Sequence, residues 1–201
     1  MSVQTVDQRT RIHVLQIIAV AAVGVFLVAA PAFQGELHEF IELTGLALLF
    51  VCFGGRIWSI LYVGGRKSEQ LVTIGPYSIT RNPLYLFSTI GAVGAGLAFG
   101  SLTLAAVAGL IAYAVMVSTA RTEAQFLSNR FGAEYDAYAA RTPLFWPRPS
   151  AYRDAGKVEF STAALRRTFI DGLYFLAIFP VMEGIDFLRE SGILPSLINL
   201  Y

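Results

Sequence analysis

Long apolar stretches separated by short polar segments make up most of the chain. Residues 12–33 and 37–62 are the first two, joined by a short connection that carries Glu36 and Glu39. A helix rises about 1.5 Å per residue and needs about 20 residues to cross a hydrocarbon core of roughly 30 Å. The pattern therefore predicts two antiparallel transmembrane helices in the first third of the chain.

A run without charged residues extends from residue 82 to residue 120. It is too long for one span, and Gly100 followed by Ser101 offers a turn, so we expect a helical hairpin with spans at about 83–100 and 101–121. The first of these spans contains several glycines. Small residues three and four apart allow close approach of a neighbouring helix, so Gly91, Gly94 and Ala98 are expected to face one.

The character of the sequence changes after the hairpin. Residues 121–147 are polar with an aromatic and aliphatic stripe at helical spacing, which predicts a cytoplasmic amphipathic helix lying on the membrane surface. The stripe consists of Leu127, Phe131, Tyr135 and Tyr138. Residues 168–188 are again apolar, although acidic residues interrupt them, and are expected to form a fifth span.

The positions of the cations give this arrangement an orientation. With five spans and a cytoplasmic N-terminus, all of the 15 lysines and arginines except Arg189 lie on the cytoplasmic side. The predicted fold is an all-α polytopic transmembrane helical bundle of about five spans, with residues 1–201 forming one integral membrane domain. A bacterial inner membrane is the expected location.

Composition limits the partners. The chain is 55% hydrophobic, its net charge is only +1, and no basic cluster is interleaved with aromatic residues, so nucleic acid is not an expected partner. Cys52 is the single cysteine, which excludes a disulfide within the chain. His13 and His38 lack neighbouring cysteines or acids at familiar metal-ligand spacings, so no metal site is expected. The oligomeric state is open.

Two polar blocks carry the candidate chemistry. The first, residues 74–85, includes GPYSITRNPLY, with a Gly-Pro turn, Arg81 as a fixed cation, Asn82 as a two-way hydrogen bonder and Pro83 as a helix-starting residue. The second block is residues 121–147. Because a hairpin returns its ends to one place, we expect both blocks at the cytoplasmic mouth of the bundle, with Arg81 near Glu123.

These blocks resemble the isoprenylcysteine carboxyl methyltransferase and phospholipid methyltransferase superfamily. Its first signature is GPY followed by RHPxY, and Asn82 stands where most members have histidine. Its second is EExxLxxxFGxxYxxY followed by prolines. The matching residues are Glu123, Leu127, Phe131, Gly132, Tyr135, Tyr138, Pro143 and Pro147, and Ala124 replaces the second glutamate.

The resemblance implies a methyltransferase that uses S-adenosylmethionine on a membrane-embedded or lipid-linked acceptor. The acceptor would be the carboxylate of an isoprenylcysteine-like thiol acid or a lipid amine. Arg81 and Glu123 would be the catalytic residues. The cofactor-binding residues would be Gly75, Pro76, Tyr77, Asn82, Pro83, Tyr85, Tyr135 and Tyr138.

Two other functions stay open from the sequence. Membrane sterol reductases that use NADPH carry a similar arginine-histidine-proline-aromatic block, although they usually have more spans. A membrane protein that keeps the fold without catalysis is the third possibility, because Asn82 and Ala124 both depart from the superfamily pattern.

Overall fold

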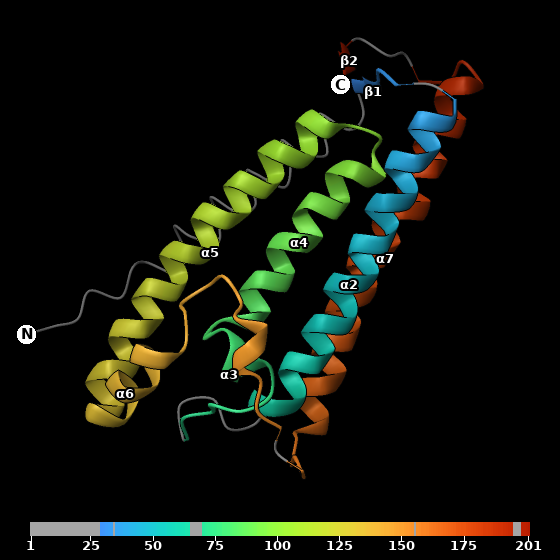
Figure 1. Ribbon diagram of the computed structural model, residues 1–201. Helices are drawn as coiled ribbons and strands as arrows, with labels where there is room; N and C mark the ends of the chain where they lie inside the picture. The colour runs from blue at the N-terminus through green and yellow to red at the C-terminus, as the bar shows by residue number, and fades with distance from the viewer. Residues whose placement is uncertain (1–28, 34, 65–69, 155, 195–197) are drawn as a thin grey trace, which may run out of the picture.

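Four helices form the body of the protein. The computed structural model describes residues 29–33, 35–64, 70–154, 156–194 and 198–201. The body consists of α2 (Glu36–Val63), α4 (Pro83–Ala98), α5 (Leu102–Phe131) and α7 (Thr162–Glu190). Smaller helices gather at one end of it, namely α3 (Pro76–Ile79), α6 (Ala133–Arg141) and the 3-10 helix η1 (Pro149–Ala151) (Figure 1). The regular secondary structure of the described residues is thus helical apart from two three-residue strands, which confirms the predicted all-α class.

The long helices have the length and composition of membrane spans. Helices α2, α5 and α7 are each long and apolar enough to cross a bilayer, whereas α4 has 16 residues and is shorter. Exposed apolar side chains such as Leu110 on α5 and Phe169 on α7 face outward, as expected for surfaces in contact with lipid. The protein is an integral membrane protein. The predicted first span, residues 12–33, lies mainly outside the described residues.

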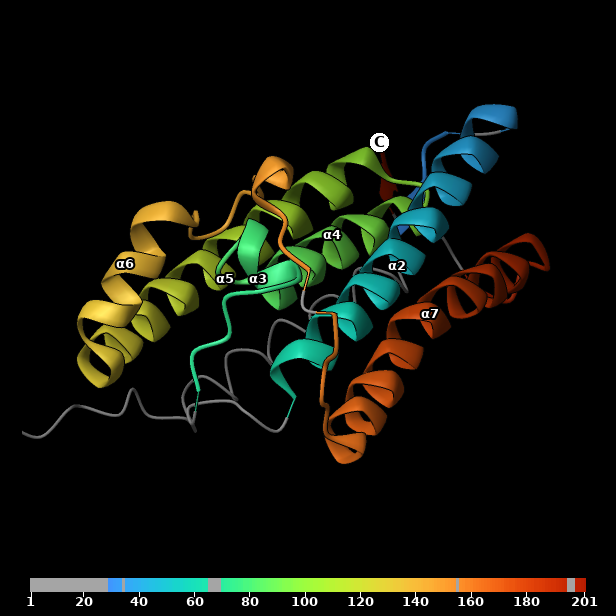
Figure 2. The same cartoon turned by 60° about the horizontal axis from the view of Figure 1, so that its bottom comes forward.

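The centre of the bundle is the contact between α2 and α4, with α5 on one side and α7 on the other (Figure 2). Small residues set the distance between α2 and α4. A Cβ atom added at Gly45 would collide with the backbone of Leu97 and Ala98, and one at Gly94 would meet the backbone oxygen of Gly45 at 3.0 Å. Gly91, Gly94 and Ala98 are buried against α2, which confirms the predicted stripe of small residues.

The hairpin turn lies where the sequence predicted it. Helix α4 ends at Ala98, and Ser101 caps the start of α5 by accepting a hydrogen bond from the Leu104 N–H at 3.1 Å. The span predicted at 101–121 is part of a longer helix, because α5 continues to Phe131. No proline or glycine lies between Arg121 and Phe131, and at about 1.5 Å per residue the 30 residues of α5 are longer than the hydrocarbon core is thick.

The predicted amphipathic helix is therefore divided between two elements. Gly132, with φ 54°, ends α5 and permits the reversal into α6. Leu127 and Phe131 belong to α5, whereas Tyr135 and Tyr138 belong to α6, so the four residues of the predicted stripe do not share one helix. Helix α7 also begins earlier than the predicted fifth span, at Thr162, where Ser161 caps it.

The opposite end of the bundle is joined by a short parallel strand pair. Strand β1 (Ala29–Pro31) pairs with β2 (Ile198–Leu200), and the Ala32 N–H donates to the Leu200 carbonyl at 2.8 Å. The predicted helix over residues 12–33 therefore does not include residues 29–31. Pro31 explains this, because proline lacks an N–H and disfavours helical geometry in the residue before it.

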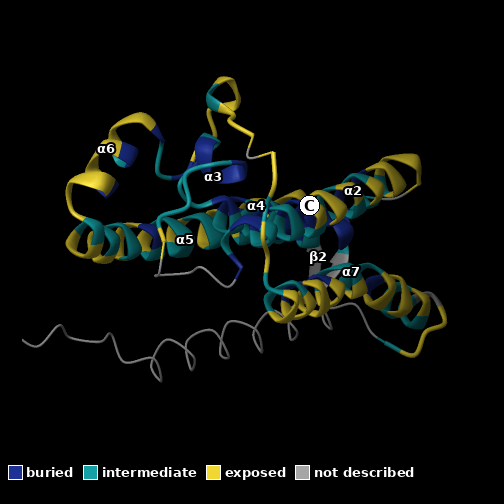
Figure 3. Ribbon diagram, turned by 90° about the horizontal axis from the view of Figure 1, so that it is seen from below, coloured by how far each residue is buried: buried dark blue, intermediate teal, exposed yellow. Residues whose placement is uncertain are grey.

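Burial differs among the helices at the end of the bundle where α3, α6 and η1 lie. Helix α3 is largely buried among its neighbours, while the outer surfaces of α6 and α7 are exposed (Figure 3). Residues 75–77, the GPY motif, are thus buried inside the protein, and the segment that connects α6 to α7 packs against them.

Candidate active site

The Gly75–Pro76 turn is fixed by its neighbours. Gly75 has φ 58°, and a Cβ atom there would collide with the Tyr62 ring. Its N–H donates to the Arg153 carbonyl at 2.8 Å, and its own carbonyl accepts from the Ser78 hydroxyl at 2.6 Å. Only glycine combines this backbone geometry with such a close ring, so the motif places α3 directly against the end of α2.

The residues after α3 are tied to the segment after α6. Thr80, which is fully buried, donates through its hydroxyl to the Phe145 carbonyl at 2.8 Å, and the Asn82 side-chain amide donates to the Leu144 carbonyl at 2.9 Å. The Arg81 N–H donates to the Pro143 carbonyl at 2.9 Å. These bonds join the two sequence blocks side by side, because each block satisfies backbone groups that the other leaves unpaired.

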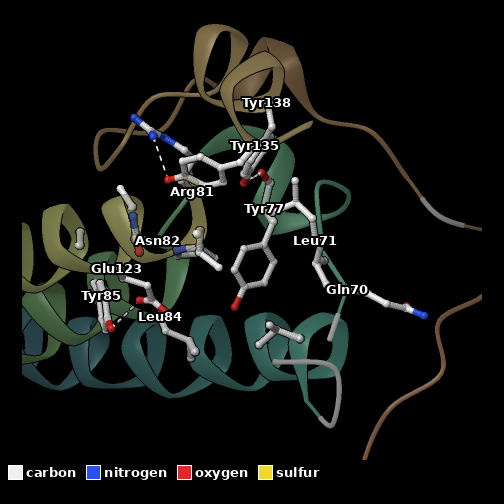
Figure 4. A pocket seen from close by; sticks show the side chains of 16 residues that line it. Gln70, Leu71, Tyr77, Arg81, Asn82, Leu84, Tyr85, Glu123, Tyr135 and Tyr138 are labelled. Atoms are coloured by element: carbon white, nitrogen blue, oxygen red, sulfur yellow. Dashed lines mark hydrogen bonds between the residues drawn. The ribbon is translucent and has the colours of Figure 1, made fainter. Parts of the chain in front are cut away.

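A cavity of about 100 Å³ lies between the two blocks (Figure 4). Its wall includes both predicted catalytic residues and most of the predicted cofactor-binding residues. These are Arg81, Glu123, Tyr77, Asn82, Pro83, Tyr85, Tyr135 and Tyr138. Gly75 and Pro76 are not among its lining residues, so they support the wall from behind as the start of α3.

Arg81 is directed toward α6. Its Nη1 donates to the Tyr135 hydroxyl at 3.1 Å, and its guanidinium carbon lies 5.8 Å from the centre of the same ring (Figure 4). Its Nε is buried and has no hydrogen-bond partner among the described residues. Arg81 thus contributes a cation to the cavity wall, with one buried donor that no described residue pairs.

Glu123, on α5, is held in place by a residue of α4. The Tyr85 hydroxyl, in the first turn of α4, donates to Glu123 Oε2 at 2.8 Å. Arg81 and Glu123 therefore line one cavity from the start of α4 and from α5. Each also has a tyrosine partner that fixes the position of its charge.

Two tyrosines form a buried aromatic side of the cavity. The Tyr138 hydroxyl donates to the Tyr77 carbonyl at 2.7 Å, which ties α6 to α3. Burial raises the pKa of Tyr77 well above its ordinary value, and nearby Tyr138 and Glu123 raise it further. Burial also raises the pKa of Tyr138, against a smaller opposing effect of Arg81. Both phenols therefore stay protonated at neutral pH and act as hydrogen-bond donors rather than bases.

Part of the wall was not predicted from the sequence. Gln70, Leu71 and Val72, in the loop after α2, also line the cavity. The signal was present as an apolar Leu71–Val72 pair in an otherwise polar loop, since a short apolar pair in such a loop usually covers something buried.

Comparison with known proteins agrees with this geometry. The phospholipid methyltransferase family matches residues 44–134, a range that includes α4, the whole first polar block and the first half of the second. The cobalt-zinc-cadmium resistance protein CzcN of Cupriavidus metallidurans is 34% identical over 194 residues, covering 96% of this chain and 89% of its own length. The chain belongs to the phospholipid methyltransferase family.

A second relative is similar over a shorter region. The nickel-cobalt-cadmium resistance protein NccN of Alcaligenes xylosoxydans xylosoxydans is 40% identical over 147 residues, covering 73% of this chain and 68% of its own length. No solved structure matches the chain. Membership of the family implies a membrane methyltransferase, and the names of both relatives refer to metal resistance.

Proposed function

We propose that the protein transfers a methyl group from S-adenosylmethionine to a membrane-embedded or lipid-linked acceptor. The observation that carries the proposal is the convergence of the two blocks. Hydrogen bonds from Thr80 and Asn82 to the segment after α6 bring the family's signature residues around one cavity. The cavity lies beside a hairpin whose outer surface is apolar, so an acceptor with a lipid chain could lie in the membrane with its polar end in the cavity.

The side chains present suit this cofactor. When bound, S-adenosylmethionine supplies a methyl group on a positively charged sulfur. Tyr77 and Tyr138 offer aromatic faces, which attract a cation by about 0.5 to 2 kcal/mol. Asn82, Pro83, Tyr85 and Tyr135 complete the set of residues proposed to hold the cofactor.

Arg81 and Glu123 are the residues that we assign to the acceptor. If the acceptor is a carboxylate, Arg81 orients it through charge-assisted hydrogen bonds. If it is an amine, Glu123 accepts its proton, with the carboxylate held in place by Tyr85. In both cases these residues align the nucleophile and exclude water, and none of them needs to form a covalent bond.

We also propose that the cavity faces the cytoplasm. The described cations gather at the end that holds the cavity, whereas Arg189 lies at the other end near the β1–β2 pair (Figure 1). Positive charge on short connections favours the cytoplasmic side. The first span, if it crosses as predicted, would place the N-terminus on the same side as the cavity.

The first test measures binding to the purified protein of S-adenosylhomocysteine and of NADPH. We expect S-adenosylhomocysteine to bind and NADPH not to bind. The reverse result would favour a reductase, and binding of neither would favour a protein without catalysis. This measurement needs no knowledge of the acceptor.

The second test follows label from methyl-labelled cofactor into lipid extracted from membranes that contain each variant. Arg81→Ala should abolish transfer while S-adenosylhomocysteine binding stays within about tenfold, or about 1.4 kcal/mol. Arg166→Ala, an exposed cation in the first turns of α7, is the matched control and should keep full transfer. Full transfer by Arg81→Ala, or loss of cofactor binding, would show that Arg81 does not serve the acceptor.

Glu123→Gln separates the two acceptor classes. Transfer should be lost if the acceptor is an amine, because the amide cannot take up a proton. It should fall less if the acceptor is a carboxylate, since a second carboxylate nearby is unfavourable. Glu134→Gln, on the exposed surface of α6, is the control and should leave transfer unchanged.

The names of the two relatives suggest a cellular role for the proposed methyl transfer. We propose that the methyl transfer of this protein contributes to growth in the presence of cobalt, zinc or cadmium, the metals in the name of the relative that spans nearly the whole chain. Expression of wild type in a metal-sensitive bacterial host should raise the tolerated metal concentration more than expression of Arg81→Ala. Equal growth of the two strains would separate metal tolerance from methyl transfer.

A further inference from the structure

The end of the bundle far from the cavity contains a second cluster of ionisable side chains. Here the start of α2 meets the last turns of α7, close to the turn between α4 and α5. His38 and Glu42 lie one helical turn apart on α2, with His38 Nε2 at 3.1 Å from Glu42 Oε1. Asp186 of α7 completes the group, and one possible ligand atom from each of the three residues lies within 4.8 Å of the others.

We propose that His38, Glu42 and Asp186 bind a divalent transition-metal cation. The three side chains come from two helices that already pack together, so only side-chain movement is needed to bring the ligand atoms to bonding distance. A metal held here would join α2 to α7 at the end where the β1–β2 pair also lies.

His38 gives an observation independent of the acids. Its Nδ1 is buried and finds no hydrogen-bond partner among the described residues. A Cβ atom at Gly100 would collide with the imidazole, so the backbone of the turn holds one side of the ring. With Nδ1 against the turn, the other ring nitrogen, Nε2, is the one that faces Glu42. An imidazole confined next to two carboxylates is also the arrangement that a metal uses.

The charges around the group favour a cation. Glu39, Glu183 and Asp186 all repel negative charge on Glu42. Arg189 offsets part of this, because its Nη1 donates to Asp186 Oδ1 at 2.6 Å. The group therefore places four carboxyl groups around one guanidinium, and a divalent ion would stabilise the charged form of those carboxyl groups.

The ligand types indicate which metals suit the site. One imidazole nitrogen and two carboxylates suit Zn²⁺ or Co²⁺, whereas Mg²⁺ and Ca²⁺ prefer oxygen alone. A thiolate is not within reach, since Cys52 lies ten residues beyond Glu42 on α2, or about 15 Å along the helix. Three protein ligands leave a coordination position open, so the ion should exchange readily.

The predicted absence of a metal site rested on spacing along the chain. His38 and Glu42 together provide only two ligands, which is too few for a site. The third ligand comes from α7, far along the sequence, and only the packing of α7 against α2 brings it close.

The test uses the full chain, purified without a histidine tag and stripped of metal, and measures binding of Co²⁺ with Mg²⁺ as a comparison. We expect one Co²⁺ per chain and much weaker Mg²⁺ binding. His38→Gln and Asp186→Asn should each weaken Co²⁺ binding by at least about tenfold, because each removes one of three ligands. The matched controls are His13→Gln and Asp136→Asn, the latter exposed on α6, and both should stay within about twofold.

Absence of Co²⁺ binding in the wild type, or equal effects of site and control variants, would overturn the proposal. A second measurement guards against variants that do not fold. The wild type has only two histidines, so chemical modification by diethyl pyrocarbonate can be followed at both. Co²⁺ should slow modification of His38 and leave His13 unchanged. Equal protection of both histidines, or protection of neither, would also overturn the proposal.

Discussion

The two ends of the bundle are built on the same helices but are held together by different kinds of contact. At the cavity end, Thr80 and Asn82 hold a separate segment by side-chain hydrogen bonds to its backbone, and space remains between the two blocks. At the other end, the turn between α4 and α5 lies against His38 and Pro31, and backbone strand pairing closes the structure. The cavity end is also basic and the opposite end acidic, apart from Arg189. The comparison shows that cavity volume depends on polar cross-links, whereas the body of the bundle depends on contacts between small residues.

Cysteine labelling should show the largest difference between the two ends, because each end should react from only one side of the membrane. In a Cys52→Ser background, Ser150→Cys marks the cavity end and Ser191→Cys marks the end of α7, and both serines are exposed. In intact cells, a thiol reagent that does not cross the membrane should label position 191 alone. Position 150 should react only after the membrane is opened. Labelling of both positions from the same side would mean that α7 does not cross.

Gly45→Leu should cause the largest loss of stability. The added side chain meets backbone rather than movable side chains, so overpacking should lower the free energy of unfolding by about 3 kcal/mol. Gly54→Leu is the matched control on the same helix, because a Cβ atom at Gly54 meets nothing within 4 Å. Unfolding in mixed detergent micelles measures both variants. Similar stability of the two would contradict the close contact between α2 and α4.

Thr80→Val should have a smaller effect, confined to the cavity end. The shape is preserved, but the buried Phe145 carbonyl loses its donor, which costs about 1 to 3 kcal/mol. Thr44→Val is the control, since Thr44 is only partly buried and its hydroxyl donates within its own helix, to the Phe40 carbonyl. We expect Thr80→Val to weaken S-adenosylhomocysteine binding as well, whereas Thr44→Val should not. Unchanged cofactor binding in Thr80→Val would show that the tie between the blocks does not shape the cavity.

Much of the helical arrangement follows from local sequence. The charge-free run with Gly100 and Ser101 in its middle predicted the hairpin, and the structure confirms that turn. Pro83 begins α4, as expected from its fixed φ and missing N–H. These features depend on neighbouring residues, so the sequence is sufficient to predict them.

Other features depend on contacts that spacing does not reveal. Helix α5 continues ten residues beyond the predicted span, because the loss of hydrophobicity at Arg121 does not show whether the helix itself ends there. The division of the tyrosine stripe depended on the conformation of Gly132. Contributions from Leu71 to the cavity and from Asp186 to the acidic end required tertiary packing.

The β1–β2 pair has a consequence for the order in which the protein can be completed. Residues 29–31 pair with residues 198–200. The pairing therefore joins two segments that are far apart in the sequence and closes a very long loop. Contacts between distant residues form late, because loop-closure entropy opposes them until the intervening structure is in place. During synthesis, β1 has no partner until residues 198–200 have left the ribosome. Assembly of the acidic end should therefore be the last step of biogenesis.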